Sequence, residues 1–181
     1  MFGGFGDTVA KMTASGFFNW FQLERVEETA GPGETVFRPS GEAFHALVSL
    51  VSRAEADGRL TGLSLNVARS FIDDPRQGAF ARDIVKSFLE AVSGGAAAVQ
   101  PLVNEIFFRA PTAPVLMRGA GPQLPEQPSE GFLAYTGRGS DWSMPLPGLV
   151  LTFANPSSDT FVVRAEPGAS KRGWLSRLLG R

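Results

Sequence analysis

Residues 60–92, LTGLSLNVARSFIDDPRQGAFARDIVKSFLEAV, change from the residue spacing of a β-strand to that of an α-helix. Apolar and polar side chains alternate over residues 63–67, which is typical of a strand with one buried face. After Asp73-Asp74-Pro75 the apolar side chains share one helical face; they are Phe80, Ile84, Val85, Phe88, Leu89 and Val92. We expect this helix to begin at the Asp-Asp-Pro sequence, to end at Gly94-Gly95 and to lie on a sheet.

Strand-like segments precede this stretch. Residues 44–52, FHALVSLVS, are followed by the turn signal Asp57-Gly58, so we predict a long hairpin at the centre of the sheet. A shorter hairpin is predicted within residues 22–38, around Gly31-Pro32-Gly33. An amino-terminal helix, capped by Asp7, is predicted before it.

The second half of the chain is predicted to return to strands after a proline-rich break. Residues 104–109 are predicted as a strand, and the prolines within residues 110–131 are typical of an extended connection. Three further strands are predicted at GFLAY (131–135), LVLTF (149–153) and TFVVRAE (160–166), with a turn at Asn155-Pro156-Ser157. So few strands rarely form a core of their own, and we expect them to pack on the first unit.

The expected fold class is therefore α+β. We expect a mostly antiparallel sheet with one main amphipathic helix packed on it, further C-terminal strands and a short terminal helix. The expected organisation is an α+β core (1–109), a Pro/Gly-rich strap or linker (110–131), C-terminal strands packed on the core (132–169) and a basic amphipathic tail (170–181).

The composition is that of a folded globular chain, with 43% hydrophobic and 19% charged residues and a net charge of -1. A near-neutral chain has no overall basic field, so no nucleic-acid partner is expected. The absence of cysteine excludes disulfides and thiolate sites and favours a cytoplasmic location. We find no secretory signal and no apolar run of the roughly eighteen residues that a membrane-spanning helix needs.

The chain offers few reactive side chains. His45 is the only histidine, which excludes a multi-histidine metal site, and its place in an apolar predicted strand favours a structural role. Asp73 and Asp74 have the chemistry of a carboxylate pair or of a hard-cation site, but helix capping explains them more simply. We expect no catalytic residue, no metal and no cofactor, which favours a chain that is not an enzyme.

Two segments are candidate binding sites. The sequence FFNWF, residues 17–21, either packs in the core or forms a surface that touches lipid or binds a partner through Phe17 and Trp20. The sequence GRGSDW, residues 137–142, is either a plain connection or a ligand loop, with Arg138 and Asp141 as charged groups and Trp142 as a stacking surface.

The carboxyl-terminal sequence SKRGWLSRLLGR, residues 170–181, combines an apolar helical face with positive charge. The apolar face holds Trp174, Leu175, Leu178 and Leu179, and the charges are those of Lys171, Arg172, Arg177 and Arg181. Such a segment would either be disordered or form a helix that packs on its own domain, on a second copy, on another protein or on an anionic membrane surface. We count the four apolar residues and Arg177 as candidate partner-binding residues, and on a membrane the protein would be peripheral to its inner face.

The order of the predicted elements over residues 7–109 resembles that of the YbjN and type III secretion chaperone-like group. The resemblance is carried by a helix, a hairpin, a long hairpin ending in LSLNVARSFIDDP (63–75), the amphipathic helix AFARDIVKSFL (79–89) and another strand. It implies a dimerising α+β module that offers sheet or helix surfaces to another protein and has no catalytic residues.

These observations favour a non-enzymatic adaptor or chaperone-like interaction module, with a protein partner or a second copy of itself. One alternative is a small-molecule-binding domain or an enzyme whose site is assembled from separate strands, of unknown ligand. The other is a peripheral membrane protein anchored by the carboxyl-terminal helix.

Overall fold

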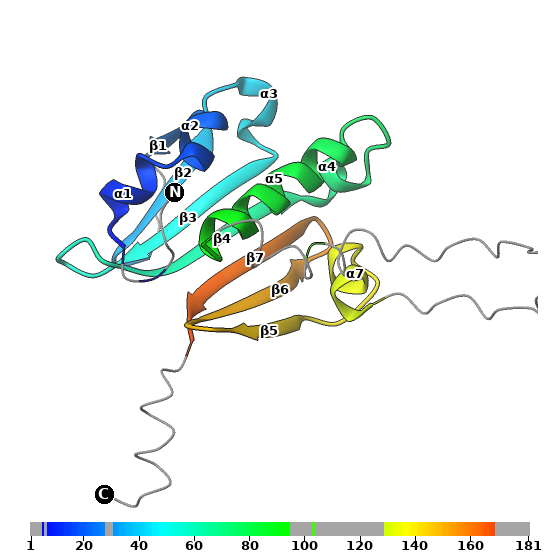
Figure 1. Ribbon diagram of the computed structural model, residues 1–181. Helices are drawn as coiled ribbons and strands as arrows, with labels where there is room; N and C mark the ends of the chain where they lie inside the picture. The colour runs from blue at the N-terminus through cyan, green and yellow to red at the C-terminus, as the bar shows by residue number, and fades with distance from the viewer. Residues whose placement is uncertain (1–4, 6, 28–30, 95–102, 104–128, 169–181) are drawn as a thin grey trace, which may run out of the picture.

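One antiparallel sheet of seven strands, in the order β1-β2-β3-β4-β7-β6-β5, runs through the part of the chain that the structure describes. The computed structural model describes residues 5, 7–27, 31–94, 103 and 129–168 (Figure 1). The helices lie against one face of the sheet (Figure 1). The fold is thus α+β with an antiparallel sheet, as predicted.

The bounds of the elements are as follows. The strands are β1 (Leu23–Val26), β2 (Glu34–Pro39), β3 (Val48–Ala54), β4 (Leu60–Ala68), β5 (Trp142–Leu146), β6 (Leu149–Ser157) and β7 (Thr160–Pro167). The helices are α1 (Val9–Thr13), α2 (Gly16–Trp20), α3 (Glu42–His45), α4 (Arg69–Asp73), α5 (Gly78–Val92) and α7 (Glu130–Tyr135).

The two amino-terminal hairpins agree with the prediction. β1 pairs with β2 across the Gly31-Pro32-Gly33 turn, and β3 pairs with β4 across Asp57-Gly58. The turns use glycine because Gly33 and Gly58 have positive φ angles, 74° and 82°, which side chains disfavour. β4 is the middle strand of the seven, which confirms the long hairpin as the centre of the sheet.

The carboxyl-terminal strands extend the same sheet. β7 pairs with β4 in antiparallel register from Leu63 opposite Ala165 to Ala68 opposite Thr160. β6 then pairs with β7, and β5 forms the edge. The first and last thirds of the described chain therefore share one hydrogen-bonded surface.

The core lies between this sheet and α5. Side chains of α5 such as Val85, Phe88 and Leu89 are buried and belong to one apolar cluster with Leu65 of β4 and Val163 of β7. Burying alternate residues of a strand leaves the intervening ones on the opposite face. Core packing on the helix side therefore fixes which side chains reach the other face of the sheet.

Two expected helix starts are wrong. Thr8, not Asp7, caps α1 by accepting a hydrogen bond from the amide of Lys11 (3.4 Å), while Asp7 accepts one from the Lys11 ammonium (2.7 Å). Asp74 caps a separate turn by accepting a hydrogen bond from the amide of Arg76 (2.7 Å), so that α5 begins only at Gly78. Short polar side chains serve turns and helix starts equally well, which is why sequence misplaces such boundaries.

His45 lies in the one-turn helix α3 and not in a strand. The turn places Phe44 against Phe71 and Phe80, with ring centroids 5.7 Å and 5.4 Å away. This packing takes priority over the β-branched pattern that begins only at Val48. His45 itself is exposed, and its backbone carbonyl accepts a hydrogen bond from Arg38.

The segment GFLAY is also helical, within α7, and is not a strand. Ser129 caps this helix by accepting a hydrogen bond from the amide of Phe132 (3.2 Å). The third carboxyl-terminal strand is instead β5. Asn155-Pro156 lies inside β6, where the register with β7 shifts, and the chain turns at Ser158-Asp159. The predictions for residues 104–109, for the connection up to residue 128 and for 170–181 lie outside the described residues.

Gly78 and Gly16 test the packing of the helices, because each is the first residue of a helix. A Cβ atom at Gly78 would lie 2.5 Å from the carbonyl oxygen of Ile72, whereas one at Gly16 would meet no atom within 4 Å. We expect Gly78→Ala to lower the free energy of unfolding by about 1–3 kcal/mol. Gly16→Ala should leave it unchanged or raise it by up to about 1 kcal/mol. Denaturant unfolding measures both, and equal effects would contradict this packing.

Candidate interaction surfaces

Four aromatic side chains, two exposed and two half-buried, form a cluster where α2, α3 and the start of α5 meet. We call Trp20, Phe21, Phe44 and Phe80 the aromatic patch. Among the described residues, Trp20 and Phe80 are the exposed large apolar side chains, with 76% and 41% of their surface accessible. Exposed apolar side chains are common singly, but a contiguous group of them marks an interaction surface.

The rings of the aromatic patch contact one another in series. Trp20 stacks on Phe21 with ring centroids 5.6 Å apart, and Phe21 lies 6.2 Å from Phe80. The ring centroid of Phe80 lies 5.4 Å from that of Phe44 and 6.1 Å from that of the buried Phe71. The patch is therefore continuous with the core through the contact of Phe80 with Phe71.

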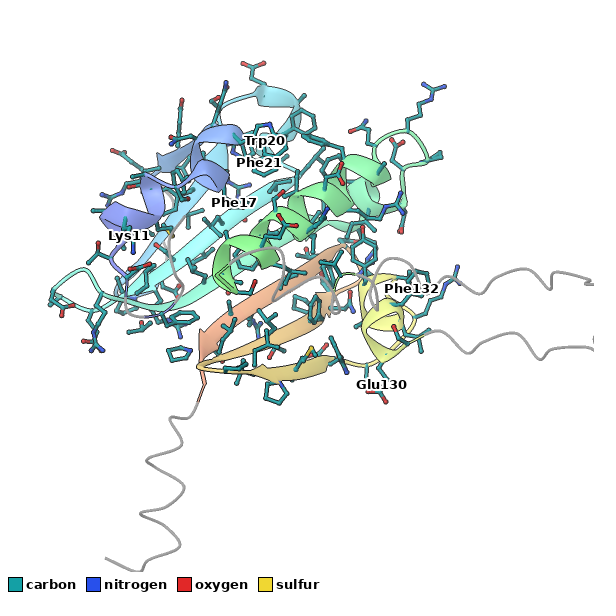
Figure 2. All side chains as sticks on the ribbon, in the orientation of Figure 1. Lys11, Phe17, Trp20, Phe21, Glu130 and Phe132 are labelled. Atoms are coloured by element: carbon teal, nitrogen blue, oxygen red, sulfur yellow. The ribbon has the colours of Figure 1, made fainter. Side chains whose placement is uncertain are left out.

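The local sequence explains why Trp20 points outward. Ser15 caps the five-residue helix α2 by accepting a hydrogen bond from the amide of Phe18, which directs Phe17 and Phe18 into the core. Gln22, which follows the C-cap residue Phe21, has a φ angle of 47°, unusual for a residue other than glycine. In Figure 2, Trp20 and Phe21 lie beside each other while Phe17 points towards α5.

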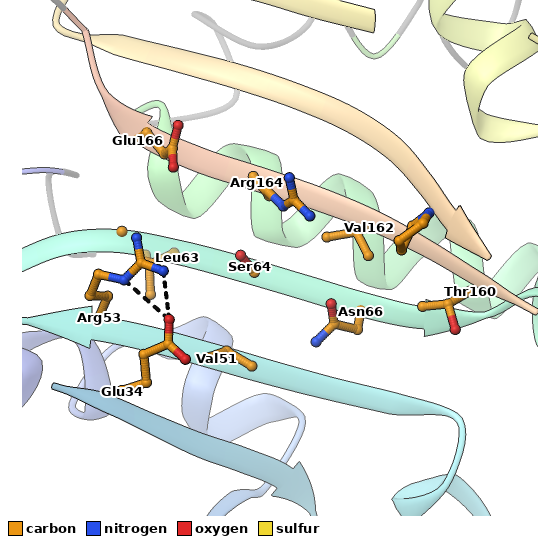
Figure 3. Close-up of a pocket in the computed structure, with 12 residues that line it drawn as sticks. Glu34, Val51, Arg53, Leu63, Ser64, Asn66, Thr160, Val162, Arg164 and Glu166 are labelled. Carbon is orange, nitrogen blue, oxygen red and sulfur yellow. Dashed lines mark hydrogen bonds and ion pairs between the residues drawn. The ribbon is translucent and has the colours of Figure 1, made fainter. Parts of the chain in front are cut away.

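A second surface is the face of the sheet that the helices of the described residues do not cover, which we call the open sheet face. A shallow hollow of about 420 Å³ lies on it, over β2, β3, β4 and β7. Figure 3 shows this side of the sheet, with α5 behind the strands. The lining side chains are mainly small or polar and include Glu34, Val51, Arg53, Ser64, Asn66, Thr160, Val162, Arg164 and Glu166.

Charges on the open sheet face are partly paired. The guanidinium of Arg53 donates two hydrogen bonds to one oxygen of Glu34, at 3.1 Å and 2.6 Å. Together with the backbone amide of Gly31, it lowers the pKa of the Glu34 carboxyl. Within the described part of the chain, Arg164 and Glu166 form neither an ion pair nor a side-chain hydrogen bond. They are therefore available to another molecule.

Arg69 fastens α7 to the sheet. Its guanidinium donates hydrogen bonds to the backbone carbonyl of Tyr135 and to the side-chain oxygen of Asn155, and lies 5.5 Å from the ring centre of Phe161. Its backbone amide donates to the carbonyl of Asp159 (2.8 Å). Burial lowers the pKa of Arg69, and the negative charge of Asp73 opposes that effect.

The predicted ligand loop is a connection between α7 and β5. Asp141 accepts a hydrogen bond from the backbone amide of Asn155 (3.1 Å), and Trp142 packs on Phe153 with ring centroids 5.3 Å apart. Both line a hollow of about 250 Å³ together with Glu130, whereas Arg138 does not line it. The structure thus brings two of the three predicted residues together and separates the third.

The other sequence candidates are placed as follows. Phe17 is a core residue with 8% of its surface accessible, and Trp20 is exposed. His45 lines none of the described hollows. The carboxyl-terminal candidates Trp174, Leu175, Arg177, Leu178 and Leu179 lie outside the described residues, and so does the predicted membrane contact.

The sequence pattern does not identify three residues of these surfaces, namely Phe80, Arg164 and Glu166. Helical spacing assigns Phe80 to the buried face of α5, but at the first turn of the helix its ring leaves the core and joins the aromatic patch. Alternation within TFVVRAE does indicate that Arg164 and Glu166 share the face opposite Val163 and Ala165. Sequence alone does not show that this face is uncovered.

The described residues show neither a metal site nor a membrane-spanning helix. The described residues contain no group of three or more His, Cys, Asp or Glu side chains able to hold a metal ion. No helix in the described ranges is long and apolar enough to cross a membrane.

The chain matches no family model, no curated protein and no solved structure.

Removing the Arg69 contacts should loosen the attachment of α7. We expect Arg69→Met and Asn155→Ala each to lower the free energy of unfolding by about 1.5–3 kcal/mol, since each leaves a hydrogen-bonding group without its partner. The loss of unfolding free energy in the double variant should be smaller than the sum of the two single losses by about 0.5–3 kcal/mol, because both changes remove the same interaction. Denaturant unfolding measures the cycle, with the exposed Arg138→Met as the control; strict additivity would contradict the contact.

Tyr135 is the only tyrosine of the chain, so phenolate absorbance reports on it directly. Burial raises the pKa of its hydroxyl. The folded state holds the proton of this hydroxyl more tightly than the unfolded state does. The contribution of the protonated hydroxyl to stability is therefore complete below about pH 10 and is lost as the pH rises further. We expect the phenolate to form together with alkaline unfolding. A phenolate that appears near pH 10 in a folded protein would contradict the buried position.

Proposed function

We propose that this chain is a non-enzymatic protein-interaction module and that the aromatic patch is its docking surface. The observation that carries the proposal is the exposure of Trp20, with 76% of its surface accessible while its ring stacks on Phe21. Tryptophan and its aromatic neighbours contribute most of the binding energy at many protein interfaces. A rigid, preformed cluster of rings also loses little conformational entropy on binding.

The partner is a protein segment that places apolar side chains against the exposed Trp20 and Phe80 rings. Exposed polar residues adjoin the patch in the sequence, among them Asn19 and Gln22 beside Trp20 and Gln77 near Phe80. An aromatic centre with a polar border is the usual composition of an interface that also exists in the free state. An adaptor or chaperone-like role, the resemblance to the YbjN and type III secretion chaperone-like group and a cytoplasmic location belong to this proposal.

Small-molecule binding is the second candidate function. The hollow of about 250 Å³ beside α7 favours it, because Glu130, Asp141 and Trp142 offer two carboxylates and an indole to one ligand. Its volume is slightly below the usual range of ligand sites, roughly 300–1,000 Å³. We therefore rank it after protein binding.

Trp20→Ser tests the docking surface, because a side chain exposed to this extent contributes little to folding. Proteins crosslinked to the wild-type chain in its native lysate are identified, purified and titrated against wild type, Trp20→Ser, Phe80→Ser and the control Arg138→Ser. We expect a partner that binds Trp20→Ser at least about tenfold more weakly than wild type and Arg138→Ser equally well. Partners with the same affinity for all four proteins, or no specific partner of the wild type, would contradict the proposal.

A further inference from the structure

The open sheet face carries two opposite charges that the described part of the chain leaves unpaired. Arg164 and Glu166 are both exposed and stand two residues apart on β7, which lies inside the sheet between β4 and β6. Across the strands, Arg164 is in register with Ser64 and with Thr152, neither of which carries a charge. In Figure 3, both charged side chains rise from β7 on the side away from α5.

We propose that the open sheet face binds a second copy of this chain. In this dimer Arg164 of each copy pairs with Glu166 of the other. A two-fold symmetric interface must be complementary to itself. Opposite charges two residues apart on one strand meet this condition when the two-fold axis lies between the two facing sheets. The axis then runs perpendicular to the strands and passes over Ala165 of β7. The two β7 strands then run antiparallel, and two ion pairs form.

The neighbouring strand fits the same arrangement. On β4, Ser64 lies level with Arg164, and Gly62 lies two residues away on the same face. The axis at Ala165 therefore places Ser64 of one copy opposite Gly62 of the other, two of the smallest residues of the face. Small residues at this position allow the sheets to approach to the usual separation of about 10 Å. The neighbouring Val51 is half-buried and provides apolar surface to bury.

The charge balance favours a second copy over a partner of one sign. The charged side chains that line the hollow are two positive, Arg53 and Arg164, and two negative, Glu34 and Glu166. Since Arg53 and Glu34 already bond to each other, what remains is a separated pair of opposite charges. A strongly acidic or basic partner would neutralise one of these and repel the other. A second copy neutralises both.

The test uses the full chain with one charge reversed at a time. Arg164→Glu places two negative side chains on each copy, and Glu166→Arg places two positive ones, so that each variant should repel itself. Mixed in equal amounts, the two variants should form a heterodimer, because every pair is then opposite in sign. Both positions are exposed, so neither change disturbs the core. The dissociation constants are measured by sedimentation velocity over a range of protein concentrations.

We expect a concentration-dependent wild-type dimer, a dissociation constant at least about tenfold higher for each variant alone, and recovery to within about threefold in the mixture. The dimer should weaken with added salt. The matched control Arg138→Glu reverses an exposed arginine outside this face and should leave the constant unchanged. A wild type that stays monomeric, variants that dimerise like wild type, or a mixture without recovery would each overturn the proposal.

The aromatic patch lies on the helix side of the sheet, so the two proposals fail independently. Trp20→Ser should leave this dimer intact. The opposite result is a dimer that dissociates in Trp20→Ser and persists in the charge-reversal variants. It would place the contact on the aromatic patch and overturn the assignment to the open sheet face.

Discussion

The pairing of β4 with β7 holds the amino-terminal and carboxyl-terminal strands in one sheet. It joins strands about one hundred residues apart in the sequence, in register from Leu63 opposite Ala165 to Ala68 opposite Thr160. At the end of β4, Arg69 adds contacts to α7 and β6. Without this seam α7 and the three carboxyl-terminal strands would have too small a core to fold alone. The open sheet face would then lose Arg164 and Glu166.

The sequence predicts the fold best where a long periodic segment meets a large core. Alternation around Leu65 and the helical spacing of α5 are strong because each is repeated over several residues. Prediction fails for the short helices α3, of 4 residues, and α7, of 6 residues. Their conformation is decided by the packing of Phe44 on Phe71 and by the Ser129 cap, which local propensity does not determine.

The candidate surfaces follow the same division. The aromatic content of residues 17–21 makes Trp20 a candidate from sequence alone, because tryptophan is enriched at the energetic centres of protein interfaces. The contribution of Phe80 depends on where α5 begins, and the Arg69 contacts join residues up to 86 positions apart. Such features follow from strand order and register, which composition and spacing do not specify.

The seven strands should fold and unfold as one cooperative sheet that presents a surface on each side. Native-state hydrogen exchange of the full chain tests it most directly, since it gives an opening free energy for each strand. We expect the backbone amides of β4 and β7 to exchange with the same opening free energy, equal to that of global unfolding. Exchange of β5, β6 and β7 at a clearly lower free energy, while β1 to β4 stay protected, would contradict it.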